Sequence, residues 1–182
     1  TSHPLNGLSG SLDYTFQVIR GTASDPAQAR NAIAGGALPE VHLIDLDWDQ
    51  THTLNATFNY SSGNKGISFI SQVGSGLSYT PESIEDISTL IQNSAKKPIT
   101  WNIDMRAYYK QRIFNQNIDF YCRIQNLFDH LNQTDIYSDT GVADRTRYIS
   151  LAQSQNPNDY YNTVEDWYNN ETYYSKPRYI EI

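Results

Sequence analysis

The stretch WNIDMRAYYKQRIFNQNIDFYCRIQNLFD, residues 101–129, decides the fold. Its side chains alternate between apolar and polar over two segments, which are separated by a very short turn near residues 114–117. Because successive side chains of a β-strand point to opposite faces, each segment has one apolar and one charged face when extended. The apolar faces carry Trp101, Ile103, Met105, Ala107 and Tyr109, and then Ile118, Phe120, Cys122 and Ile124. The pattern predicts a β-hairpin and leaves open which medium covers its apolar face.

The composition excludes some classes of protein. The 182 residues are enough for one domain with a core of its own. With 13 Lys and Arg against 20 Asp and Glu, the net charge is -7, which argues against a nucleic-acid partner. The single cysteine, Cys122, excludes an intrachain disulfide and takes the position of an apolar packing residue.

The same alternation recurs elsewhere in the chain. It predicts strands over residues 10–21, 51–60 and 66–79, and the start of another over 175–182. The period is lost near Gly74, which indicates a bulge or a bend. Long connections over 22–50, 80–100 and 129–177 separate these strands, and apolar residues within 84–91 have the spacing of a short helix.

Two predicted hairpins, 51–79 and 101–129, follow one rule of register. Polar side chains take odd positions in 53–59 and even positions in 68–72, then even positions in 102–110 and odd positions in 119–125. Residues that pair in an antiparallel hairpin have a constant index sum, so an odd sum pairs polar with polar in both hairpins. This agreement predicts one continuous antiparallel sheet.

The unequal connections point towards a membrane barrel. No stretch has the roughly 20 apolar residues of a membrane helix, and no signal peptide is visible. A spanning strand needs only about 9–11 residues, so a mean hydropathy of -0.59 is compatible with an outer-membrane barrel. Such barrels have short turns at one edge and long loops at the other, with aromatic residues near the strand ends. Here those aromatics are Tyr60, Tyr79, Trp101, Tyr109 and Phe114.

Several motifs resemble one family. The segment LDWDQTHTLN, residues 46–55, resembles the signature that opens a late barrel strand in TonB-dependent outer-membrane receptors, particularly those with a carboxypeptidase-regulatory-like N-terminal domain. Further segments resemble that family in the same order: YTFQVIRGTASDP (14–26), RIQNLFD (123–129), YSDTG (137–141) and KPRY (176–179). Thr51 departs from the family, which usually has Arg there.

The resemblance implies a fold and a location. The chain would hold the last six strands of a transmembrane β-barrel of about 22 strands, with the sixth cut short and without the terminal aromatic. The plug domain and the earlier strands would be absent, and the three long connections would be extracellular loops. Partners would be the remainder of the barrel, the plug, outer-membrane lipid and, through the absent N-terminal part, the TonB system.

The function that the resemblance implies is TonB-energised uptake of a scarce nutrient across the outer membrane. The nutrient would be a siderophore, a glycan or a peptide, and the barrel would need no cofactor and do no covalent chemistry. The residues themselves also indicate no enzyme site, since the chain has no Gly-rich phosphate loop and no nucleophile elbow.

Metal binding is likewise not expected. Asp45, Asp47 and Asp49 alternate as in a calcium loop, but Gln50 and Ala56 stand where that motif needs Gly and Glu. An ordered carboxylate loop at a strand entry is the better interpretation. The four histidines are scattered.

The last connection is the expected ligand-binding element. Its aromatics are interleaved with Asn, Asp and Glu, which combine contact area with polar tips. The candidate ligand-binding residues are Tyr160, Tyr161, Trp167, Tyr168, Tyr173 and Tyr174. The competing interpretation is that they pack the loop against its neighbours.

A second hypothesis is a soluble antiparallel β domain that binds carbohydrate or protein through aromatic-rich loops. The two hypotheses differ in what covers six apolar side chains. In a receptor they form an exposed band on a curved sheet, and in a soluble domain a second layer covers them. These six are Leu54, Phe58, Ile103, Met105, Phe120 and Ile124.

Overall fold

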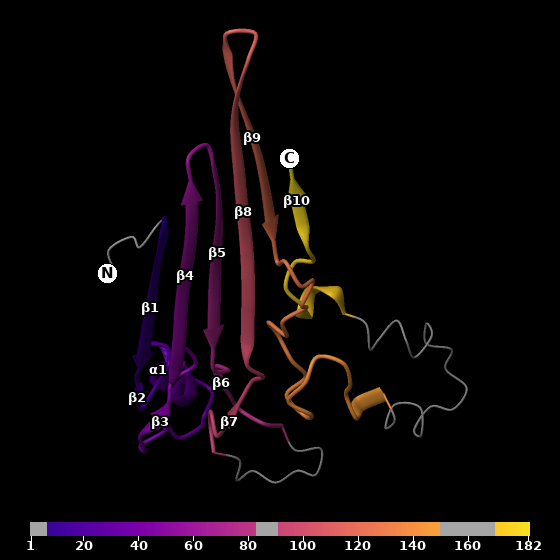
Figure 1. The fold of residues 1–182 in the computed structure, drawn as a ribbon. Coiled ribbons are helices and arrows are strands. Elements are labelled where there is room, and N and C mark those ends of the chain that lie inside the picture. Colours follow the sequence, from indigo (N-terminus) through magenta and orange to yellow (C-terminus); the bar gives the residue numbers. More distant parts are fainter. Residues whose placement is uncertain (1–6, 83–90, 150–169) are drawn as a thin grey trace, which may run out of the picture.

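Six strands form one antiparallel sheet in the computed structural model, which describes residues 7–82, 91–149 and 170–182 (Figure 1). The strands are β1 (Leu8–Phe16), β4 (His52–Ser62), β5 (Lys65–Gly74), β8 (Thr100–Ile113), β9 (Gln116–Gln125) and β10 (Tyr179–Glu181). They are arranged in the order β1-β4-β5-β8-β9-β10. The mostly β, antiparallel fold class is therefore confirmed. Since β1 and β10 form the two edges, the described strands do not close into a barrel.

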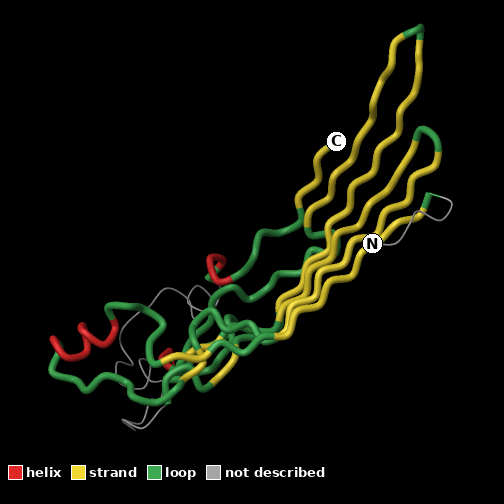
Figure 2. Tube along the Cα trace, turned by 90° about the vertical axis from the view of Figure 1, so that its left-hand side faces the viewer, coloured by secondary structure: helices red, strands yellow, loops and turns green. Residues whose placement is uncertain are grey.

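The smaller elements gather at one end of this sheet (Figure 2). Strand β2 (Arg20–Gly21) pairs with β3 (Ile44–Asp45), and β6 (Ser78–Tyr79) pairs with β7 (Ala95–Lys96). The first long connection also contains the helix α1 (Gln28–Ala34), and a 3-10 turn, η1 (Glu171–Tyr173), precedes β10. The tight turns lie at the opposite end, so long connections and short turns are segregated.

The predicted register of both hairpins is confirmed. Phe58 pairs with Phe69 in the first hairpin, and Tyr109 pairs with Phe120 in the second. The pairings β1–β4, β5–β8 and β9–β10 follow the same rule, because apolar residues of one strand pair mainly with apolar residues of the next. In all six strands, the apolar positions therefore lie on the same face of the sheet.

Both hairpin turns have two central residues. Gly63 has a φ of 57° at the first central position of its turn, where glycine adopts a positive φ without a steric penalty. In the second turn Phe114 and Asn115 both have positive φ, at 47° and 65°, as a type I′ turn requires. Asn64 also joins its turn to β8, since its side-chain amide donates to the Lys110 carbonyl over 2.7 Å.

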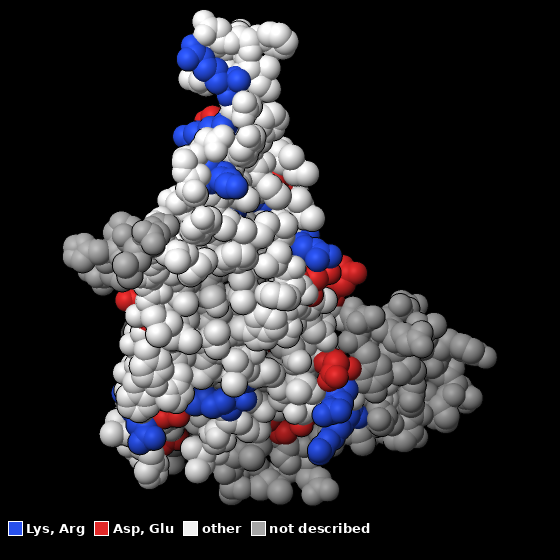
Figure 3. All heavy atoms as spheres, viewed as in Figure 1, with Lys and Arg blue, Asp and Glu red and all other residues white. Residues whose placement is uncertain are grey.

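The sheet has one apolar and one polar face. Lys65, next to a turn, is the only Asp, Glu, Lys or Arg on the apolar face of the six strands. The polar face carries Asp13, Asp104, Arg106, Lys110, Arg112, Asp119, Arg123 and Glu181. Lys and Arg gather along the protruding end of the β8–β9 hairpin (Figure 3).

The buried apolar residues lie outside this sheet. Among the described residues they are Ile44, Leu46, Ile136 and Ala143, all at the loop end. On the apolar face, by contrast, Leu12 is 70% exposed, Phe58 47% and Phe120 53%. The other four of the six diagnostic side chains are half-buried, and no described segment forms a second layer over them.

Some boundaries were predicted wrongly. The strand expected over 10–21 ends at Phe16, because the Ile19 amide donates to the Asp49 carboxylate instead of to a neighbouring strand. The strand expected over 66–79 ends at Gly74, where the Gln50 side chain fills the space that a Cβ would need. The last strand begins at Tyr179 rather than Ser175. The helix expected near 84–91 lies mostly outside the described residues.

Candidate binding site

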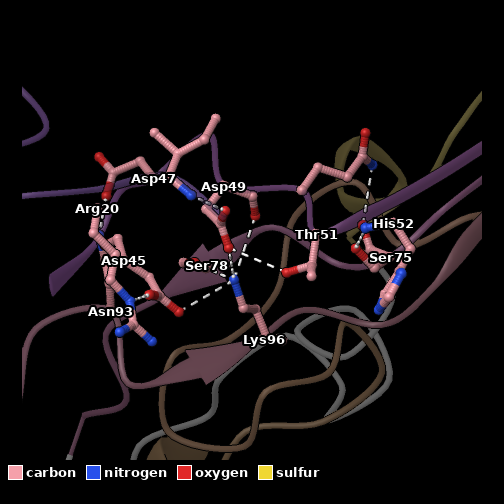
Figure 4. A network of polar contacts seen from close by, with 12 residues as sticks. Arg20, Asp45, Asp47, Asp49, Thr51, His52, Ser75, Ser78, Asn93 and Lys96 are labelled. Carbon is pink, nitrogen blue, oxygen red and sulfur yellow. Dashed lines mark hydrogen bonds and ion pairs between the residues drawn. The ribbon is translucent and has the colours of Figure 1, made fainter. Parts of the chain in front are cut away.

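The LDWDQ segment places a buried carboxylate at the base of the loops (Figure 4). Asp49 is only 1% exposed, and its Oδ1 accepts a hydrogen bond of 2.7 Å from the Ile19 amide. Its Oδ2 accepts a short hydrogen bond from the Lys96 ammonium and a longer one, of 3.3 Å, from the Thr51 hydroxyl. Asp49 thus joins the end of β1, the start of β4 and strand β7.

The charge of Asp49 is set by two opposed effects. Burial raises the pKa of the carboxyl, but the hydrogen bonds from Lys96 and from the Ile19 amide lower it by more. The net pKa lies below the ordinary value of an aspartate. The carboxylate is therefore charged at neutral pH and paired with Lys96.

The two neighbouring carboxylates also bind groups of the protein itself. Asp45 accepts from Arg20 over 2.9 Å and lies 3.5 Å from the Lys96 ammonium. Asp47 accepts from the Asn93 side-chain amide over 2.6 Å. The three aspartates thus connect the first and second long connections, and among the described residues no group of three or more His, Cys, Asp or Glu is placed to hold a metal ion.

The NLFD segment connects β9 to the last long connection. Asn126 has a φ of 53°, and its side chain bonds the backbone N–H and C=O of His130 and the carbonyl of Lys176. Asp129 has a φ of 55° and accepts from the Arg178 amide over 2.7 Å. Asn and Asp tolerate this backbone region better than most residues. These bonds hold together the two ends of the last long connection.

A hollow of about 680 Å³, lined by several polar side chains but with more apolar than polar surface, lies where this connection returns to the sheet. Its floor is one row across three strands, because Gln125 pairs with Tyr179, and the β8–β9 register, extended by one residue beyond the pair Met105–Ile124, brings Asp104 opposite Gln125. All three lie on the polar face. We call this site the β8–β10 hollow; its remaining lining residues are Asn102, Asn126, Asn132, Ser175, Lys176, Pro177 and Arg178.

Several polar groups of the β8–β10 hollow are available to a ligand. The Asp104 Oδ1 accepts hydrogen bonds of 2.7 Å from Asn102 and 3.0 Å from the Asn126 amide, which leaves its Oδ2 open. Within the described part of the chain, the side chains of Gln125, Lys176 and Tyr179 form no hydrogen bond or ion pair. The hollow therefore offers hydrogen-bond acceptors and donors side by side.

The aromatic residues predicted to bind ligand are only partly described. Tyr160, Tyr161, Trp167 and Tyr168 lie outside the described residues. Tyr173 and Tyr174 are half-buried and do not line the β8–β10 hollow. The Tyr173 ring lies 5.0 Å from that of Tyr137, and burial raises the pKa of Tyr174. The Tyr173 ring therefore packs within the last long connection, and ligand binding by these tyrosines stays a prediction.

A second hollow, of about 750 Å³, lies within the first long connection and is lined largely by apolar groups such as Leu38, Val41 and Ala32. At its edge, hydrogen bonds from the His42 backbone and ring lower the pKa of Glu40.

Sequence reasoning missed the β8–β10 hollow. Asp104 and Gln125 were already on the predicted polar face, but an odd index sum alone does not specify that they lie opposite each other. What the sequence did not provide was the register of β10 against β9, which adds Tyr179 to the row.

Comparisons with known proteins do not assign this chain to a family. No protein-family model matches the chain, and no curated protein or solved structure is significantly similar to it. Membership of the family that the motifs resemble is therefore a proposal.

No helix in the described part of the chain is long and apolar enough to span a membrane.

Proposed function

We propose that this chain forms part of the barrel wall of a TonB-dependent outer-membrane receptor, which imports a scarce nutrient. The observation that carries the proposal is the apolar face of the sheet, which no described segment covers. Apolar side chains stay on this one face through all five strand pairings. A face almost free of charge stabilises a sheet only when something apolar covers it, and lipid is such a cover.

The dimensions of this face support the proposal. Trp101 and Tyr109 mark its two ends on β8 and lie about 26 Å apart at about 3.3 Å per residue. Tyr14 and Phe16 lie near the Trp101 end, and Tyr60 and Phe120 lie near the Tyr109 end. Membrane barrels have an apolar band about 25 Å tall between two girdles of aromatic residues, so the match is close.

The arrangement of the connections supports the same proposal. Long connections at one end and two-residue turns at the other correspond to extracellular loops and periplasmic turns. The motifs that resemble the receptors also have physical roles here, since Asp49 and Asn126 hold the bases of those loops.

The edge strands define the partners in this proposal. β1 and β10 each have one neighbour in the sheet, and open strand edges are not tolerated in lipid. The remainder of the barrel would cover these edges, and a plug would fill the polar lumen. The chain alone is then a wall segment and not a working transporter.

The soluble β domain finds less support. It requires a second layer over Phe58, Phe120 and their neighbours, and the described residues supply none. No observation on the described residues favours it over the receptor.

A flotation experiment tests the membrane part of the proposal. The chain is refolded in detergent, reconstituted with phosphatidylethanolamine–phosphatidylglycerol vesicles, and centrifuged in a density gradient. We expect it to float with the vesicles and to resist carbonate extraction, with the open edges β1 and β10 paired between copies of the chain. Monodisperse, lipid-free protein that stays at the bottom of the gradient would contradict the proposal.

The DNA around the coding segment tests the receptor part. We expect it to encode, in the same reading frame and upstream, further alternating strands and a plug domain. A frame that encodes a soluble multidomain protein instead would refute the assignment to TonB-dependent receptors.

A further inference from the structure

We propose that the β8–β10 hollow is a carbohydrate-binding site, which narrows the nutrient to a glycan. This inference rests on the proposed function, because it treats the polar face of the sheet as a lumen that the nutrient reaches. The chemistry of the groups that line the hollow supports it.

The floor of the hollow presents three different polar groups in one row. Asp104, Gln125 and Tyr179 follow one another across β8, β9 and β10, and adjacent strands are about 4.8 Å apart. Such a row contacts several substituents of one small ring or of two linked rings. It provides a carboxylate, an amide and a phenol in sequence.

The mixture of charges selects among ligands. An anionic ligand would be attracted to Lys176 and Arg178 but repelled by the open oxygen of Asp104. A cationic ligand would meet the opposite conflict. A hydroxyl group both donates and accepts, so a ligand rich in hydroxyls satisfies all of these groups together.

The aromatic ring provides the apolar part of the site. Tyr179 is 57% exposed, and its ring lies at the end of the floor row. An exposed ring with a polar tip can cover an apolar C–H face while its hydroxyl binds a neighbouring group. Sugars combine such a face with a rim of hydroxyls, so they match an exposed phenol ring that lies beside polar groups.

The hollow is held in place before any ligand binds. Asn132 accepts from the Trp101 amide over 2.7 Å and donates to the Trp101 carbonyl over 2.8 Å. The Asn126 side chain bonds the carbonyl of Lys176, which fixes the wall segment against the floor. Binding groups on a fixed scaffold lose little conformational entropy when they bind.

A glycan array tests the proposal. The detergent-solubilised full chain is applied to an array of neutral and acidic oligosaccharides, and the affinity of each bound glycan is then measured in solution. We expect binding to at least one oligosaccharide, weakened tenfold or more by Asp104→Asn, because a hydrogen bond to a charged group contributes about 1.5–3 kcal/mol. We also expect Tyr179→Ala to weaken binding more than Tyr179→Phe.

Matched variants make the test specific. Asp119→Asn changes a carboxylate on the same face but outside the hollow, and we expect unchanged affinity. Lys176→Met separates the glycan classes, since we expect it to weaken the binding of acidic oligosaccharides more than that of neutral ones. Near-ultraviolet circular dichroism of each variant excludes misfolding as the cause.

The two proposals can fail separately. A chain that floats with vesicles but binds no glycan, or binds glycans with unchanged affinity after Asp104→Asn, would overturn the carbohydrate site alone. A chain that does not float would overturn the receptor assignment whatever the array shows.

Discussion

The ion pair between Asp49 and Lys96 makes the loop base sensitive to acid. The folded-state pKa of Asp49 lies below its unfolded value, so its ionised form stabilises the fold. That contribution is complete above the ordinary aspartate pKa of about 3.9 and is lost as the pH falls through the lower folded-state value.

We therefore predict acid-induced opening of the loop base. Hydrogen exchange of the Ile19 amide, corrected for its intrinsic pH dependence, should lose protection below about pH 4, because that amide donates to Asp49. Asp49→Asn should remove this pH dependence, since it no longer titrates. Equal protection of the wild type at pH 3 and pH 7 would contradict the assignment.

Phe58 and Asn59 provide a matched pair on the two faces of β4. Phe58 lies on the apolar face opposite Phe69, and Asn59 lies on the polar face opposite Ser68. A Lys on the lipid side of a membrane barrel costs about 2–4 kcal/mol near the midplane.

We predict that Phe58→Lys lowers the stability of the reconstituted chain by about 2–4 kcal/mol, whereas Asn59→Lys changes it by less than about 1 kcal/mol. Urea titration of the protein in vesicles measures both. Similar costs for the two substitutions would mean that the faces do not meet different media.

At the scale of elements, the β8–β9 turn carries local strain. Phe114 is 97% exposed and has a φ of 47°, a conformation that a bulky side chain adopts at a cost of about 1–3 kcal/mol. Asn adopts that backbone more readily and is common in type I′ turns.

We predict that Phe114→Asn stabilises the hairpin by about 1 kcal/mol. Gly63→Ala, in the turn between β4 and β5, should destabilise that hairpin by a similar amount, since the φ of Gly63 is also positive. Urea midpoints of the two variants in detergent micelles provide the comparison. A lower midpoint for Phe114→Asn would show that the aromatic ring has a contact that outweighs the strain.

Alternation was enough to predict the strands and the register of both hairpins. A shift by one residue would move Ile103 and Phe120 to the charged face, so the pattern of Arg106, Asp104 and Asp119 defines the pairing. The fold class, and the polar face on which Asp104 and Gln125 lie, were therefore accessible from the sequence, whereas the exact pairing of these two residues was not.

Other elements depend on contacts that no local pattern encodes. The two-residue strands β2, β3, β6 and β7 are too short to show a period. Helix α1 has no buried residue, so it has no amphipathic stripe to detect. The end of β1 depends on Asp49, which is distant in sequence from Ile19.

At the scale of the whole molecule, the distribution of burial separates the two hypotheses. Among the described residues, the buried apolar side chains are those of Ile44, Leu46, Ile136 and Ala143 at the loop end, and no described segment covers Phe58 and Phe120 on the large sheet. In the proposed receptor, lipid covers this face.

The single cysteine tests that claim directly. Cys122 lies on the apolar face opposite Ala107, and its neighbour Tyr121 lies on the polar face opposite Tyr108. A nitroxide label on Cys122 of the reconstituted chain is compared with one on Tyr121→Cys in a Cys122→Ser background. Power-saturation spectroscopy then measures collisions of each label with oxygen, which concentrates in lipid, and with a water-soluble nickel complex.

We predict that the label at 122 collides mainly with oxygen and the label at 121 mainly with the nickel complex. Two labels equally accessible to nickel, or a label at 122 shielded from both reagents, would contradict the claim.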